Sequence, residues 1–100
     1  MITQIEMPLA EVAEFCRRCH IRRLALFGSV LRQDFRPDSD VDLLVEFEGG
    51  VVVGLLEMAQ MEIELGELLG RRVDLRTPAE LSRYFRQRVL DSAETVYVRG

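Results

Sequence analysis

No stretch of this chain limits its fold as strongly as a Gly28-Ser29 pair that is followed, after ten intervening residues, by Asp40 and Asp42. Residues 24–27 form a short apolar run of strand character that stops at Gly28, and Ser29 then stands where a helix begins. Backbone N–H groups at such a turn point outward, the helix dipole adds partial positive charge, and glycine lets an anion come close. This segment therefore predicts a phosphate-binding turn.

The segment from Asp40 to Phe47 has the alternation of a half-buried strand, in which apolar residues occupy every second position: Val41, Leu43, Val45 and Phe47. Asp40 and Asp42 then share the other face, with Cα atoms roughly 6.6 Å apart, so their carboxylates can converge on divalent cations. Mg²⁺ accepts carboxylate and phosphate oxygens together. A phosphate-binding turn beside such a carboxylate pair predicts a domain that binds a nucleoside triphosphate and displaces pyrophosphate.

This pattern, G-S and then D-x-D with hydrophobic flanks, resembles that of the DNA polymerase beta-like nucleotidyltransferase superfamily, on Gly28, Ser29, Asp40 and Asp42. The short chain and the run RPDSDVDLLVEF are similar to the minimal nucleotidyltransferase, or MNT-domain, proteins, and the resemblance covers nearly the whole sequence. A surface turn followed by an acidic strand face is the alternative without a function. The resemblance implies that Asp40 and Asp42 are catalytic metal ligands, and that Gly28 and Ser29 hold the triphosphate.

The resemblance also implies further site residues. The segment from Arg72 to Arg76 predicts a strand with Asp74 on the face away from the core. The superfamily has a third acidic residue on a later strand, so Asp74 is expected to complete the metal site and to take the proton of the attacking hydroxyl. A surface pair between Asp74 and a neighbouring Arg is the alternative.

Arg32 stands where the MNT motif usually carries Arg, which implies contact with the triphosphate. A pair with Asp34 or Asp38 is an equally weighted alternative. Ser39 lies in the turn before the aspartates. The expected nucleotide-binding residues are therefore Gly28, Ser29, Arg32 and Ser39.

The length and the charge limit what else the chain can do. One hundred residues make a single domain, residues 1–100, with no room for a separate substrate domain. The net charge of −4 argues against broad nucleic-acid binding, and because all thirteen basic residues are Arg, phosphate contacts must come from Arg or from the backbone. No stretch has the apolar length of a membrane span, and the N-terminus lacks the pattern of a signal peptide, so we expect a cytoplasmic protein.

Helical periodicity predicts the elements that support these segments. Met7 to Cys19 is expected to be a helix, and Val53 to Leu69 a second helix closed by Gly70. The apolar arc of the second helix, about 240°, is wider than one sheet can bury, and other helices or another protein must cover the surplus, which includes Met58, Met61, Leu65 and Leu68. Thr77-Pro78 is expected to open a last helix to about Ser92, with Leu81, Phe85, Val89 and Leu90 inward. Residues 95–98 are expected to form a final strand.

Cys16, Cys19 and His20 form a C-x-x-C-H sequence, which is formally the c-type haem attachment pattern. Both Cys lie on the apolar stripe of the first predicted helix, away from a helix start where a thiolate would be stabilised, and no export signal is visible. We therefore expect buried thiols with neither a haem nor a redox role.

These inferences combine into one hypothesis. The expected fold class is α/β, the two-layer nucleotidyltransferase fold, with a small mixed sheet, helices on one face, and Asp40, Asp42 and Asp74 on the other. The resemblance implies a Mg²⁺-dependent enzyme with a two-metal site that transfers AMP from ATP to a hydroxyl, with tyrosine favoured, on a HEPN-domain toxin, and that acts as its antitoxin in a hetero-oligomer. A non-catalytic antitoxin that inhibits by contact alone is the alternative. A transferase for a small molecule such as an antibiotic is less favoured.

Overall fold

The computed structural model describes residues 8–28, 40–84 and 86–99. The elements follow one another as α1 (Leu9–Arg18), β1 (Ile21–Phe27), β2 (Val41–Phe47), α2 (Leu55–Leu69), β3 (Val73–Arg76), the 3₁₀ helix η2 (Pro78–Glu80), α3 (Arg86–Ser92) and β4 (Glu94–Val98). The four strands form one sheet in the order β3-β2-β1-β4. Strand β1 is antiparallel to β2 and β4, whereas β2 and β3 are parallel, so the sheet is mixed.

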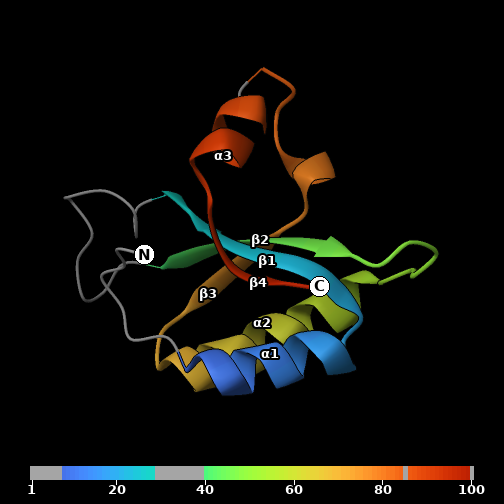
Figure 1. Ribbon diagram of the computed structural model, residues 1–100, viewed down its shortest axis with the longest axis vertical. Coiled ribbons are helices and arrows are strands. Elements are labelled where there is room, and N and C mark those ends of the chain that lie inside the picture. The colour runs from blue at the N-terminus through green and yellow to red at the C-terminus, as the bar shows by residue number, and fades with distance from the viewer. Residues whose placement is uncertain (1–7, 29–39, 85, 100) are drawn as a thin grey trace.

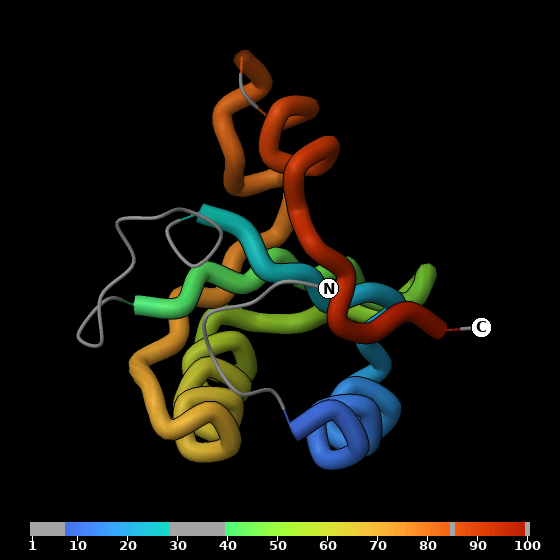
Figure 2. Tube along the Cα trace, turned by 60° about the vertical axis from the view of Figure 1, so that its left-hand side comes forward, coloured from blue at the N-terminus to red at the C-terminus, as the bar shows by residue number. Residues whose placement is uncertain are grey.

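Helices α1 and α2 lie next to each other on one face of the sheet, and α3 stands on the opposite side (Figure 1). The same arrangement is visible from the second direction (Figure 2). The predicted two-layer α/β fold with a small mixed sheet is confirmed, and the helices that pack on one face are α1 and α2. Among the described residues, no helix has both the length and the apolar character that a membrane span needs.

The core lies between the sheet and the two helices on its lower face in Figure 1. Helix α1 contributes Val12, Phe15 and Cys16, and α2 contributes Met61 and Leu65, all of them buried. The strands complete this core with Ile21, Leu24, Leu26, Val41, Leu43, Val45, Val73 and Leu75. Burying one large apolar side chain stabilises the fold by roughly 1.5–3 kcal/mol, so this layer fixes the strands that carry the expected site.

The ends of α2 explain why this helix forms where the periodicity predicts it. The Glu57 side chain accepts a hydrogen bond from the backbone N–H of Gly54 at 3.2 Å, which satisfies a donor just before the first turn. Gly70 closes the helix in the left-handed conformation, with φ of 67°, as the sequence indicated. A Cβ on Gly66 would lie 2.9 Å from the backbone oxygen of Arg71, so a glycine at this position lets the chain after the helix approach closely.

The wide apolar arc of α2 is largely accounted for by the fold itself. Met61 and Leu65 are buried, and Met58 and Leu68 pack against the core as partly buried residues. Burial by neighbouring elements, one of the two predicted alternatives, therefore explains these four side chains. The large apolar residues of α2 that remain exposed are different ones: Leu55, Leu56 and Ile63.

The predicted single helix from Thr77 to about Ser92 is wrong. It is divided into η2 and α3, because Leu81 adopts an extended backbone, with φ of −82° and ψ of 145°. Ser82 then starts a new turn, since its hydroxyl accepts a hydrogen bond from the backbone N–H of Tyr84 at 3.3 Å. The predicted inward positions Leu81, Val89 and Leu90 are only half-buried, and Phe85 lies outside the described residues.

A carboxylate from α2 covers part of the sheet edge formed by β3. Glu62 Oε2 accepts a partly buried hydrogen bond from the backbone N–H of Leu75 at 2.7 Å. An edge strand otherwise presents unpaired N–H groups to solvent or to another chain. Glu62 therefore both fixes β3 against α2 and blocks strand addition at this edge.

We expect Glu62→Ala to lower the free energy of unfolding by about 1–2 kcal/mol, because the Leu75 N–H loses its charged acceptor. Glu62→Gln keeps an acceptor oxygen and should lose less than half as much. The matched control is Glu67→Ala, which removes an exposed carboxylate from the same helix. Urea denaturation measures all three, and an equal loss for the two Ala variants would show that the bond to β3 contributes nothing.

Candidate active site

The strand register brings two of the predicted aspartates together. Asp42 on β2 pairs across the parallel ladder with Asp74 on β3, and on its other side it pairs with Phe27 of β1. Neighbouring strands lie about 4.8 Å apart. Val41, Leu43, Val73 and Leu75 flank the two aspartates and are all buried in the core, so both carboxylates point to the opposite face of the sheet. The two acids are therefore neighbours on that face.

Gly28 directly follows β1 and lies against Asp42. Its φ of 77° is in the left-handed region, and a Cβ built on it would stand 2.3 Å from Asp42 Oδ2. No side chain fits in that space, and an L-residue is strained in that conformation. At the turn predicted at Gly28, the main chain therefore lies directly beside the Asp42 carboxylate, with no side chain between them.

Two arginines of the β3 segment face the aspartates. Arg76 Nε lies 3.1 Å from Asp74 Oδ1, and Arg76 Nη2 donates to Asp74 Oδ2 at 3.2 Å. Asp40, which precedes β2, lies with its Oδ1 4.0 Å from Arg72 Nε. The surface pair that was the alternative interpretation of Asp74 is therefore present, together with the predicted position beside Asp42.

Within residues 8–28, 40–84 and 86–99, no three His, Cys, Asp or Glu side chains converge in a way that would hold a metal ion. The contacts with arginine give a physical reason, since each guanidinium attracts an aspartate toward itself. The donor set nevertheless fits Mg²⁺. Asp42 and Asp74 offer hard oxygen ligands in register on one face, and the missing side chain of Gly28 leaves room for a phosphate to approach them.

Three of the predicted nucleotide-binding residues, Ser29, Arg32 and Ser39, lie outside the described residues. Gly28 is described, and it occupies the predicted turn. The short helix expected at residues 30–33 also lies outside the described part of the chain. The side chain that sequence reasoning left unassigned is Arg76. Its position two residues after Asp74, on the same face of a strand, was the signal that could have identified it.

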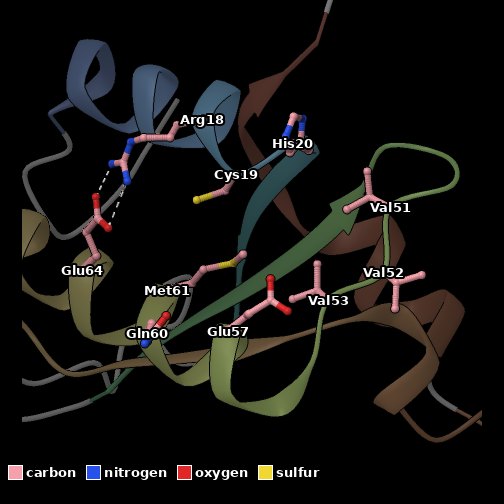
Figure 3. A pocket seen from close by; sticks show the side chains of 10 residues that line it. All are labelled: Arg18, Cys19, His20, Val51, Val52, Val53, Glu57, Gln60, Met61 and Glu64. Carbon is pink, nitrogen blue, oxygen red and sulfur yellow. Dashed lines mark hydrogen bonds and ion pairs between the residues drawn. The ribbon is translucent and has the colours of Figure 1, made fainter.

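The opposite end of the sheet carries a hollow of about 370 Å³, lined by the C-terminal turn of α1, residues 51–53 and one side of α2. Figure 3 shows Cys19 and Met61 extending into it from the two helices, and an ion pair between Arg18 and Glu64 at its rim. The hollow adjoins the start of β1 and the segment after β2, whereas Gly28 and Asp42 lie at the other ends of these strands. It is therefore separate from the candidate site.

The C-x-x-C-H sequence forms part of this second region. Cys16 is fully buried in the core and Cys19 is half-buried, and both are free thiols. Burial, assisted by the neighbouring Cys19, raises the pKa of the Cys16 thiol to about 12. Burial also raises the pKa of Cys19. Cys16 is buried as expected, whereas Cys19 is only half-buried, and the raised pKa values of both thiols oppose the thiolate that redox chemistry needs.

The burial of Cys16 predicts a loss of stability in alkali. An unfolded thiol loses its proton near pH 9.0 and the native one near pH 12, so between these values the unfolded state releases a proton that the native state keeps. The free energy of unfolding should therefore fall as the pH rises through this window. Urea unfolding from pH 8 to pH 11 should show a smaller decline for Cys16→Ala than for the unchanged protein. Equal slopes would contradict the assignment.

This fold, with two acidic side chains in register beside a glycine turn, is of the nucleotidyltransferase type. The chain belongs to the nucleotidyltransferase domain family, and the match covers residues 9–96. It is similar to the protein adenylyltransferase MntA of Thermococcus cleftensis, with 39% identity over 98 residues, 97% of this chain and 95% of that protein.

Solved structures share this architecture. A protein assigned as a minimal nucleotidyltransferase matches with a TM-score of 0.70 and 41% identity over 85% of both chains. An MNT antitoxin from Shewanella oneidensis, in complex with a tri-AMPylated HEPN toxin, matches with a TM-score of 0.66 over 91% of this chain and 70% of that one. Because the sequence identity to this second structure is 18%, the similarity shows a common fold and no more.

Proposed function

We propose that this protein transfers AMP from ATP to a hydroxyl group, with tyrosine the favoured acceptor, on a HEPN-domain partner toxin, and that it acts as the antitoxin of the pair. The observation that carries the proposal is the register of Asp42 with Asp74 beside the side-chain-free turn at Gly28. The similarity to a protein adenylyltransferase, at 39% identity over nearly the whole chain, supports the reaction type. Because this reaction needs ATP, we expect the pair to act in the cytoplasm.

Each part of the site has a role in this reaction. Asp42 and Asp74 would hold Mg²⁺, with Asp40 as a further ligand at the same edge. Gly28, together with Ser29, Arg32 and Ser39, would bind the triphosphate, because backbone N–H groups and guanidinium groups are good phosphate donors. When bound, the metal supplies positive charge that offsets the charge developing on the attacking and leaving oxygens.

The acceptor must approach from the face that carries the aspartates. The hydroxyl oxygen attacks the α-phosphorus, the bond to the bridging oxygen of pyrophosphate breaks, and the hydroxyl proton is taken up by a carboxylate, for which Asp74 is the candidate. In the proposed reaction the partner presents its own hydroxyl at this face.

The decisive experiment incubates the protein with the product of the neighbouring gene, expected to be a HEPN-domain protein, together with ATP and Mg²⁺. We expect the mass of the partner to increase by one or more adenylyl groups, with loss of its toxic activity. If the partner's mass is unchanged while its activity is still suppressed at equal stoichiometry, the contact-only antitoxin is correct. The two bonds between Arg76 and Asp74 are the observation that favours this second candidate, because they occupy a predicted metal ligand.

A further inference from the structure

The contact between Arg76 and Asp74 engages both oxygens of the aspartate. Nε approaches Oδ1 at 3.1 Å and Nη2 donates to Oδ2 at 3.2 Å, which is the two-point geometry in which a guanidinium binds a carboxylate most firmly. The two residues stand on the same face of β3, two positions apart. While this contact is intact, one lone pair on each Asp74 oxygen and a neighbouring positive charge oppose the binding of a cation there.

Arg76 has a second carboxylate within reach. Its Nη1 lies 3.8 Å from Glu80 Oε2, and Glu80 Oε1 accepts a hydrogen bond from the Thr77 hydroxyl at 3.3 Å. Thr77 directly follows β3, and Glu80 lies at the end of η2. Arg76 is half-exposed, with 49% of its side chain accessible, so the guanidinium has room to move between the two acids.

We propose that Arg76 is a positioning residue that competes with the divalent cation for Asp74. Without a cation, Arg76 engages both oxygens of the Asp74 carboxylate. On loading, Asp74 exchanges Arg76 for the metal, and the guanidinium moves to Glu80. This inference rests on the proposed function, because it takes the metal to bind at the Asp42 and Asp74 carboxylates.

The exchange gives the variants opposite effects on metal affinity. Removing the guanidinium frees Asp74 and deletes a positive charge next to the site, so Arg76→Gln should bind the cation more tightly. Arg76→Lys keeps the charge but loses the two-point contact, and should fall between Arg76→Gln and the unchanged protein. Glu80→Gln removes the second partner of Arg76, which then stays on Asp74, so the cation should bind more weakly.

The experiment measures binding of Mn²⁺ to the full-length protein, by the electron paramagnetic resonance signal of the free ion, with and without a non-hydrolysable ATP analogue. We expect Arg76→Gln to lower the Kd for Mn²⁺ about fivefold or more. Glu80→Gln should raise that Kd. Arg88→Gln, which removes an exposed arginine of α3, is the matched control and should leave it unchanged.

A double substitution separates positioning from general charge effects. In an Asp74→Asn background, Arg76→Gln should change the Kd for Mn²⁺ much less, because the carboxylate over which the two compete is gone and only the effect of the deleted charge remains. Persistence of the full effect in that background would overturn the inference. So would an unchanged or weakened affinity in Arg76→Gln. Thermal unfolding of the metal-free variants identifies any that do not fold, and in that case Arg76→Lys and Glu80→Gln decide the question.

Failure of this inference differs from failure of the proposed function. If the partner is adenylylated but Arg76→Gln leaves the Kd for Mn²⁺ unchanged, the role of Arg76 alone is wrong. If Mn²⁺ binds in an Asp42-dependent way and the substitutions act as expected, yet no AMP is transferred, the proposed function alone is wrong. If the unchanged protein binds no Mn²⁺ with the nucleotide analogue, both fail.

Discussion

Asp42→Asn is expected to reduce AMP transfer to the partner about a thousandfold or more, while Asp91→Asn leaves the rate unchanged. Asp42 lies at the centre of the site, in register with Asp74 on one side and against Gly28 on the other. The amide keeps the size of the side chain but removes the negative charge that binds a cation. Several kcal/mol of transition-state stabilisation should be lost as a result. Asp91 is exposed on α3 and serves as the matched control.

Initial rates of labelled AMP incorporation into the partner measure this effect, and urea unfolding of each variant shows whether the fold is retained. If Asp42→Asn keeps more than about a tenth of the rate with normal stability, transfer does not take place at this carboxylate pair. The same preparation should bind the partner as tightly as the unchanged protein does. That result would separate catalysis from docking.

The sequence could predict β2 well because two signals agreed there. The alternation from Asp40 to Phe47 predicted both the strand and the faces of its residues, and in the structure the strand is one residue shorter at its start, Val41–Phe47. The pairing of Asp42 with Asp74 was not visible in the same way. It depends on the parallel alignment of β2 with β3, which tertiary packing sets and local periodicity does not report.

The segment after β3 shows where local rules fail. Thr77 and Pro78 do start a helical turn, as predicted, but the chain leaves the helix at Leu81. Ser82 had the chemistry of a helix start and was not given that role, so two short elements were merged into one. The half-burial of Leu81, Val89 and Leu90 fits this outcome, since η2 and α3 lie on the far side of the sheet from the main core (Figure 1).

The candidate site, too, could be predicted from the sequence only in part. Gly28 lies against Asp42, and Asp74 lies beside Asp42 on the next strand, as the family resemblance implied. The roles of Ser29, Arg32 and Ser39 stay predictions. The Asp74–Arg76 contact was foreseen only as an alternative without a function, because a pair of opposite charges two residues apart on a strand is common at protein surfaces. What the sequence could not give was the two-point geometry, on which the proposed competition between Arg76 and the metal for Asp74 rests.

Gly28→Ala is expected to remove most of the transfer activity, and a second glycine provides the control. Gly28 has φ of 77° and Gly50 has φ of 84°, so an alanine is strained at either position by about 1 kcal/mol. The two differ in their surroundings. A Cβ on Gly28 would stand 2.3 Å from Asp42 Oδ2, whereas a Cβ on Gly50 would have nothing within 4 Å.

Gly50→Ala should therefore lose about 1 kcal/mol of stability and keep its transfer rate. Gly28→Ala should lose at least about 1 kcal/mol more, because the carboxylate of Asp42 or the turn itself has to shift. A displacement of about 1 Å at a reacting centre can cost a hundredfold in rate, so the transfer rate of Gly28→Ala should fall by at least that factor. Urea denaturation and labelled AMP incorporation measure both variants side by side. If they lose the same stability and keep the same activity, the close approach of Gly28 to Asp42 has no part in the reaction.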